Sequence, residues 1–134
     1  MARKEKKEKW PKLESYLVPL FQSSWVYLCT TREDWLQAHR NLKAESNNVQ
    51  KVAGCVRHFY DEITGENMYL MGVFDGKVST LVHECAHTCF YVCADVGVPI
   101  DTSSPNETYC YLLERMFERF LPHIKVNEER QDGK

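Results

Sequence analysis

The chain lacks the features that would assign it to several specialised classes of protein. No stretch approaches the roughly 18 consecutive apolar residues of a membrane-spanning helix, and the basic N-terminus is not followed by an apolar run typical of a signal peptide. The formal net charge is only −2, so the composition gives no support for nucleic acid as a partner. We therefore expect a cytoplasmic protein that binds neither membrane nor nucleic acid.

Cysteine is present six times, but its spacing does not favour disulfides. Cys85, Cys89 and Cys93 recur every four residues within one predicted helix, and neighbours on one helix face are poorly placed to bridge each other. We interpret this stripe as reduced, packed thiols, since free cysteine behaves as a small hydrophobic residue. A separate thiolate metal site that includes Cys110 stays open as an alternative.

The length of 134 residues corresponds to one domain. We expect a charged tail over residues 1–12, a single domain over 13–122 and a polar tail over 123–134. Hydrophobic periodicity, caps and turn residues predict strand, helix, hairpin, helix, helix. The expected strands span 23–31, 49–62 and 66–76, and the expected helices span 32–44, 80–96 and 105–121, capped by Thr31, Ser79 and Ser104. This order is typical of an α+β domain with a small three-stranded sheet.

The predicted middle helix carries the sequence His83-Glu84-Cys85-Ala86-His87. Residues four apart on a helix are separated by only about 40° around its axis, so both imidazoles can face one ion. This is the HExxH pattern, in which two histidines bind zinc and the glutamate takes a proton from a metal-bound water. The alternative is an ordinary helix with two packed histidines and a surface glutamate.

A catalytic zinc site requires a third protein ligand, and the next predicted helix offers Glu107. This residue follows His87 by twenty positions, which is enough chain to end one helix and enter an antiparallel neighbour. Ser104-Pro105-Asn106-Glu107 also fits a capping box, in which the glutamate reaches back to the cap residue. Both interpretations stay open from the residues alone.

The segment LVHECAH, followed after this interval by Asn106-Glu107, resembles the gluzincin metallopeptidases, the thermolysin-like branch of the zincins. Together with DVGV and PNETYCYLLE it is similar to small zincin-like proteins encoded in tailed phages and prophages. The resemblance implies a minimal zincin-like domain in which His83, His87 and Glu107 bind Zn²⁺ and Glu84 is the general base. It also implies a location in the host cytoplasm if the chain is encoded by a bacteriophage.

The chain departs from the family pattern around these ligands. In thermolysin-like enzymes a carboxylate one turn after the third ligand holds a ligand histidine, whereas Tyr111 stands at that position here. A metal-bound histidine donates its second N–H to an acceptor, and the alternatives here are Glu114 and a backbone carbonyl. Candidates for stabilising the developing oxyanion are Tyr109, Tyr111, His58, Tyr60 and His123.

The expected function is zinc-dependent hydrolysis of peptide bonds. We expect a peptide or protein substrate to lie extended along the strand at 66–74, by β-strand addition. The alternative is a non-catalytic zincin-fold protein that binds a host or phage protein, with structural or vestigial zinc.

Overall fold

The computed structural model describes residues 8–132, with side chains up to Ile124. In chain order the elements are β1 (Glu14–Leu17), β2 (Ser24–Cys29), α1 (Arg32–Leu42), β3 (Gly54–Tyr60), β4 (Asn67–Val73), α2 (Val78–Asp95) and α3 (Glu107–Asp132). The strands form one mixed sheet in the order β1-β2-β4-β3. β2 and β4 are parallel neighbours, while β1 and β3 run antiparallel to them at the two edges. The predicted α+β class is confirmed.

The predicted number of strands is wrong, because the sheet has four strands within residues 8–132. The additional strand is β1, with the sequence ESYL. It is half-buried throughout. Its four residues are too few to show the alternation of apolar and polar residues by which a strand is recognised in a sequence. It is ordered by its pairing with β2, from Glu14 opposite Leu28 to Leu17 opposite Trp25.

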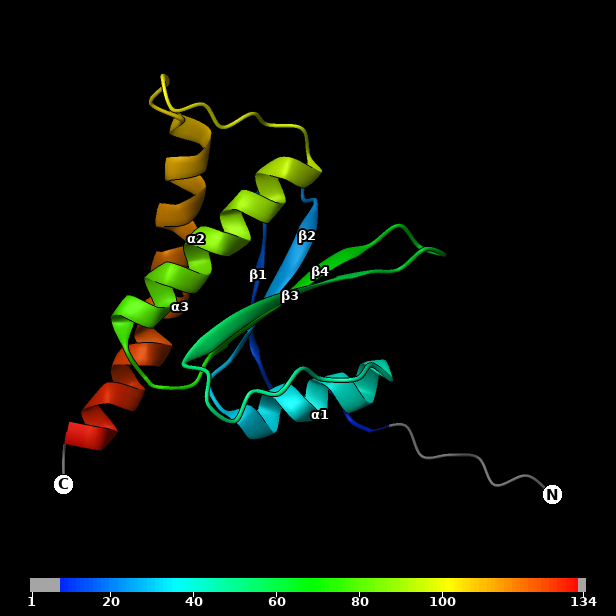
Figure 1. The fold of residues 1–134 in the computed structure, drawn as a ribbon, viewed down its shortest axis with the longest axis vertical. Helices are drawn as coiled ribbons and strands as arrows, with labels where there is room; N and C mark the ends of the chain where they lie inside the picture. Colours follow the sequence, from blue (N-terminus) through cyan, green and yellow to red (C-terminus); the bar gives the residue numbers. More distant parts are fainter. Residues whose placement is uncertain (1–7, 133–134) are drawn as a thin grey trace.

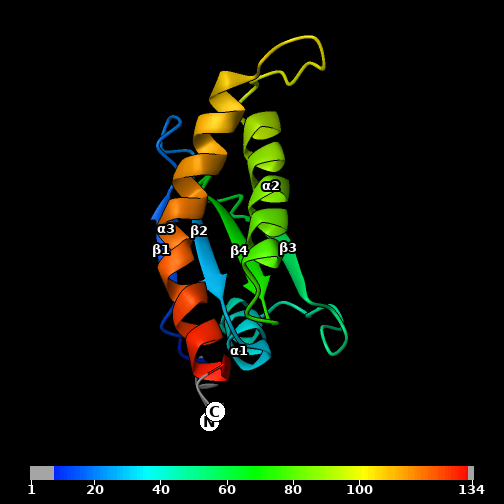
Figure 2. The same ribbon diagram turned by 90° about the vertical axis from the view of Figure 1, so that its left-hand side faces the viewer.

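The sheet is covered on both faces (Figures 1 and 2). α2 and α3 run antiparallel on one face and α1 lies on the other. β2 and β4 are apolar on both sides, as expected for strands buried between two layers. Toward α2 and α3 the sheet contributes Val26, Leu28, Tyr69, Met71 and Val73. Toward α1 it contributes Cys29 and Leu70, which pack with Trp35, Ala38 and Val49.

The predicted start of α1 is confirmed, whereas the predicted start of α2 and the predicted end of α3 are wrong. Thr31 caps α1 as predicted, and its hydroxyl accepts from Asp34 N at 3.1 Å. α2 begins at Val78, before the predicted cap Ser79. Asp75 organises this start instead, because its carboxylate accepts from Lys77 N and from Thr80 Oγ1.

The predicted end of the last helix before Pro122 is also wrong, because α3 continues through Pro122 to Asp132. A proline inside a helix removes one backbone hydrogen bond and normally ends or kinks the helix. Phe120 and Ile124 are both fully buried in the core on either side of Pro122. Their packing holds the chain in the helical path despite the missing hydrogen bond.

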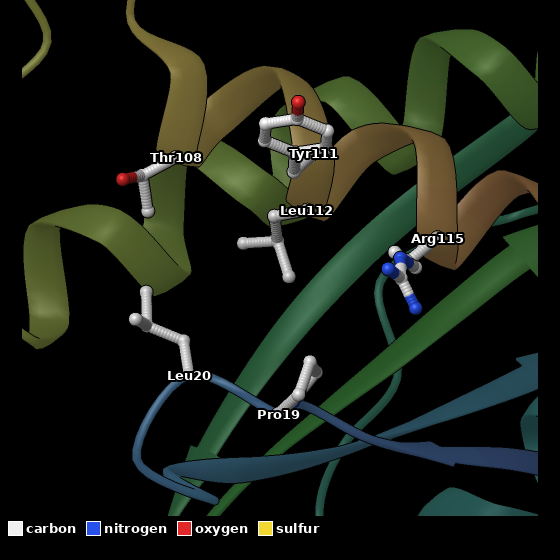
Figure 3. Close-up of a pocket in the computed structure, with 6 residues that line it drawn as sticks. All are labelled: Pro19, Leu20, Thr108, Tyr111, Leu112 and Arg115. Carbon is white, nitrogen blue, oxygen red and sulfur yellow. The ribbon is translucent and has the colours of Figure 1, made fainter.

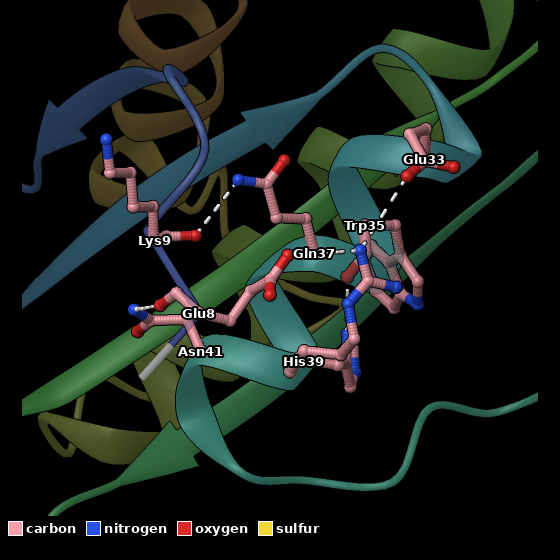
Figure 4. A network of polar contacts seen from close by, with 8 residues as sticks. Glu8, Lys9, Glu33, Trp35, Gln37, His39 and Asn41 are labelled. Carbon is pink, nitrogen blue, oxygen red and sulfur yellow. Dashed lines mark hydrogen bonds and ion pairs between the residues drawn. The ribbon is translucent and has the colours of Figure 1, made fainter. Parts of the chain in front are cut away.

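Glu8 and Lys9 of the predicted N-terminal tail lie against α1 (Figure 4). Gln37 and Asn41 of α1 donate to the carbonyl oxygens of Lys9 and Glu8, at 3.0 and 2.6 Å. Trp10 then packs edge-on against Tyr27, with ring centroids 5.1 Å apart. The remainder of the predicted tail, residues 1–7, lies outside the described residues. No helix among residues 8–132 is long and apolar enough to span a membrane.

His39 lies on the buried face of α1, with 2% of its surface exposed. Its ring contacts Trp35 and Phe59, and its Nδ1 lies 2.8 Å from the carbonyl oxygen of Trp35. The opposite nitrogen, Nε2, has no hydrogen-bond partner within the described part of the chain. Burial therefore lowers the pKa of His39, and the positive charge of Arg57 contributes in the same direction.

This lowered pKa predicts a loss of stability in mild acid. The unfolded chain binds a proton at His39 near pH 6.5, whereas the folded chain resists it, so the free energy of unfolding falls as the pH drops through about 6.5. Replacing His39 by Phe keeps an apolar ring and removes the titration. Urea unfolding between pH 7.5 and pH 5 should show the wild type losing stability relative to His39→Phe. A constant difference between the two proteins would contradict this.

Candidate active site

α2 separates a buried face from a solvent face. Its buried side packs on β4, β3 and α3 and is made of small and branched residues: Leu81, Cys85, Thr88, Cys89, Val92 and Cys93. The predicted packing role of the cysteines is confirmed for Cys85, Cys89 and Cys93, which are fully buried. Burial raises the pKa of the Cys85 thiol to about 12. Because this stripe turns inward, His83 and His87 are presented on the opposite, exposed face.

The two histidines point at a common location. Their Nε2 atoms lie 3.1 Å apart, with ring centroids 4.7 Å apart and planes at 80°. Two nitrogens bound to one tetrahedral zinc at 2.0–2.1 Å are separated by about 3.3 Å. A distance of 3.1 Å is that of a hydrogen bond between the two imidazoles, and it also lies within about 0.2 Å of the separation that one zinc ion requires of two such ligands.

Glu84 lies beside the pair but turns toward β3, and only 6% of its surface is exposed. Burial raises the pKa of its carboxyl group, while His83 and His87 act in the opposite direction. Together with His83 it lines an open hollow of about 340 Å³, whose remaining walls are Ala53, Gly54, Ser79 and Thr80. A carboxylate and an imidazole therefore face the same space at the end of the edge strand.

Gly54 allows this arrangement and was not singled out by the sequence. A methyl group at Gly54 would lie 2.6 Å from the carbonyl oxygen of Gly72, 2.8 Å from Thr80 Cγ2 and 3.0 Å from Glu84 Cγ. Only glycine lets the first residue of β3 approach α2 so closely. The single sequence signal is a glycine at the start of a strand-like segment, which by itself does not reveal the helix that it contacts.

The prediction that a substrate pairs with the strand at 66–74 is wrong. β4 lies inside the sheet, paired with β2 on one side and β3 on the other. The antiparallel edge strand beside Glu84 is β3. The sequence predicted the hairpin but not which of its strands lies at the edge, because β2 pairs with β4 across an intervening helix and strand.

Glu107 is the first residue of α3 and is exposed. The predicted cap at Ser104 is wrong, because the first helical hydrogen bond runs from Cys110 N to Asn106 O. Asn106 has a φ of 53°, and its side chain bonds Asp101 and Ser104 to close the preceding loop. Glu107 therefore does not stand at the third helical position that a capping box requires.

The described residues contain no group of three or more His, Cys, Asp or Glu side chains that could hold a metal ion. The structure thus brings His83 and His87 together and places Glu84 beside them, whereas Glu107 does not complete a cluster with them.

The other candidates on α3 occupy different surroundings. Tyr109 packs on Phe90 at 4.7 Å and donates to the carbonyl oxygen of Ala86 at 3.2 Å, so it contacts α2 one residue before His87. Tyr111 lines a separate hollow of about 440 Å³ with Leu112, Arg115 and the β1–β2 loop (Figure 3). Glu114 is exposed. Of these three residues, Tyr109 is the one whose hydroxyl is hydrogen-bonded to α2, the helix that carries His83 and His87.

Comparisons with known proteins give no further assignment. Neither a scan against protein-family models nor searches of curated proteins and of solved structures found a match to this chain.

The close approach at Gly54 predicts that Gly54→Ala is destabilising. The added methyl group meets the backbone of β4 and pushes α2 from β3, at a cost of about 1–3 kcal/mol. Urea unfolding of the variant should show this loss. A methyl group at Gly97 would meet nothing within 4 Å, but the φ of 76° is unfavourable for alanine. The variant Gly97→Ala therefore measures the cost of backbone strain without a steric clash. Unchanged stability of Gly54→Ala would contradict the close packing of Gly54 against Thr80 and Glu84.

Proposed function

We propose that this chain is a zinc-dependent metallopeptidase of gluzincin type, built on a minimal zincin-like domain. His83, His87 and Glu107 are the proposed Zn²⁺ ligands, and Glu84 is the proposed general base. The observation that carries the proposal is the 3.1 Å separation of the two histidine Nε2 atoms, with Glu84 and His83 lining one hollow beside an edge strand.

The protein groups have distinct roles in this proposal. Bound zinc supplies an acidified water and polarises the substrate carbonyl. Glu84 accepts the proton of the attacking water and transfers it to the leaving amine. Its burial supports this role, because a carboxyl group with a raised pKa holds a proton more readily than one in water.

The substrate in this proposal is an extended peptide that pairs with β3. The free edge of β3 offers backbone donors and acceptors, and it begins at Gly54, where Glu84 and His83 line the hollow. Pairing there places a peptide bond beside the proposed base without a separate lid. An enclosed pocket is not required for a substrate that is held by its backbone.

A second candidate function is favoured by the position of Glu107, which does not join a three-residue cluster within the described part of the chain. In this case the domain binds a host or phage protein without cutting it, and two histidines alone hold zinc weakly or not at all. Metal content and turnover separate the two functions.

The first prediction from this proposal concerns metal content. Purified wild type should contain about one zinc per chain by elemental analysis, and His83→Ala should contain none, because the remaining ligands cannot retain the ion. His123→Ala is the matched control, since His123 pairs with Glu14 on another surface and should retain the metal. Glu107→Ala should weaken zinc binding at least tenfold in a competition titration with a chelator. Full zinc affinity in that variant would remove Glu107 from the ligand set.

The second prediction concerns turnover. Glu84→Gln removes the base but preserves shape, so it should keep its zinc and lose peptide hydrolysis by at least a hundredfold. Cleavage of a proteome-derived peptide library, followed by mass spectrometry, measures this. A Glu84→Gln protein that cleaves as fast as the wild type would rule out the mechanism. Wild type that binds zinc but cleaves nothing would favour the binding function.

A further inference from the structure

Three aromatic rings join α2 to the edge of the sheet one turn beyond the histidine pair. Tyr91 of α2 stacks on Tyr69 of β4, with centroids 6.3 Å apart and planes at 7°. His58 of β3 stacks on Tyr69 at 4.7 Å and 21°. Tyr69 is buried between its neighbours, while His58 is exposed and 50% of Tyr91 is exposed. We call His58, Tyr69 and Tyr91 the aromatic shelf.

The aromatic shelf continues the line of the candidate active site. His83, His87 and Tyr91 recur every four residues and fall within about 80° of one another around the helix. α2 and β3 run in the same direction, because Glu84 meets Gly54 at one end and Asp95 accepts from Asn67, the partner of Tyr60, at the other. The free edge of β3 therefore leads from the hollow at Gly54 to the shelf at His58.

A chain of hydrogen bonds holds the outer ring of the shelf in place. The amide nitrogen of Asn67 donates to Asp95 Oδ2 at 3.1 Å, so its oxygen faces His58 and accepts from Nε2 at 2.7 Å. The ring of His58 is fixed by this bond and by its stacking on Tyr69. A rigid, exposed ring can bind a partner with little loss of conformational entropy.

We propose that the aromatic shelf is a substrate subsite that binds an aromatic side chain three or four residues from the scissile bond. This inference rests on the proposed peptidase function. An extended peptide advances about 3.3 Å per residue, and the four residues from Gly54 to His58 span about 13 Å. Side chains of a peptide paired with β3 alternate between the two faces of the sheet, so one of them reaches the shelf on the α2 side.

Phe90 provides a matched comparison for Tyr91. It precedes Tyr91 in α2 and is similarly exposed, at 47%. Its ring turns to the other side of the helix, where it packs on Tyr109 of α3 at 4.7 Å. Removing Phe90 therefore deletes a half-exposed aromatic ring from the same helix without touching the shelf.

The test uses the zinc-loaded chain of 134 residues. The substrates are peptides of about twelve alanine, serine and threonine residues, each with one phenylalanine at a different position. Mass spectrometry locates each cleavage. The cut should move with the phenylalanine at a fixed separation of three or four residues, and kcat/KM should exceed that of the phenylalanine-free peptide about tenfold. Tyr91→Ala should abolish this phasing, whereas Tyr91→Phe and Phe90→Ala should retain it. A cut that ignores the phenylalanine, or phasing that survives in Tyr91→Ala, would overturn the proposal.

A binding measurement separates failure of the subsite from failure of the peptidase function. If wild type cleaves neither these peptides nor the proteome-derived library, the peptidase function fails, and fluorescence anisotropy with labelled peptides tests the aromatic shelf by itself. Tighter binding of the phenylalanine peptide to wild type and Phe90→Ala, lost in Tyr91→Ala, would support it. Equal affinity for the two peptides in wild type would reject it.

Discussion

The apolar face of α2 packs on β4, β3 and α3, and the small side chains of Cys85, Cys89 and Cys93 belong to this buried contact. This packing decides the rotation of the helix about its axis. With the thiols inward, residues half a turn away face solvent, and these include both histidines. With Gly54 beneath Thr80 and Glu84, the helix also lies close to β3. The candidate chemistry therefore depends on a close contact between a helix and an edge strand.

The same contact gives Glu84 its unusual position. The carboxylate is placed on the side of α2 that faces β3, so it is buried, and burial raises its pKa. The histidines one residue before it and three residues after it stay in solvent. One helix thus presents two kinds of group in two environments: exposed imidazole nitrogens, and a largely buried carboxyl group that lines an open hollow. The proposed metal-assisted hydrolysis uses the carboxyl group as the base and the two nitrogens as ligands.

Much of the fold follows from local patterns. Thr31 and its helix, the hairpin of β3 and β4, and α2 with its inward cysteine stripe were all predicted from spacing and caps, because these signals act over a few residues. The failures involve distant partners. β1 has no pattern of its own and depends on β2. The helix passes Pro122 because Phe120 and Ile124 are buried against other elements. Neither the pairing of β1 nor the packing around Pro122 can be predicted from the neighbouring residues in the sequence.

For the site, the sequence by itself determined that His83 and His87 share a helix face, because four residues always make slightly more than one turn. It also determined that Glu84 is adjacent to them. Only the tertiary structure decided that Glu84 is buried, that β3 rather than β4 is the free edge, that Tyr91 meets Tyr69 and His58, and that Glu107 begins α3 in solvent. Each of these depends on which elements pack side by side, and that is set by contacts between residues far apart in the chain.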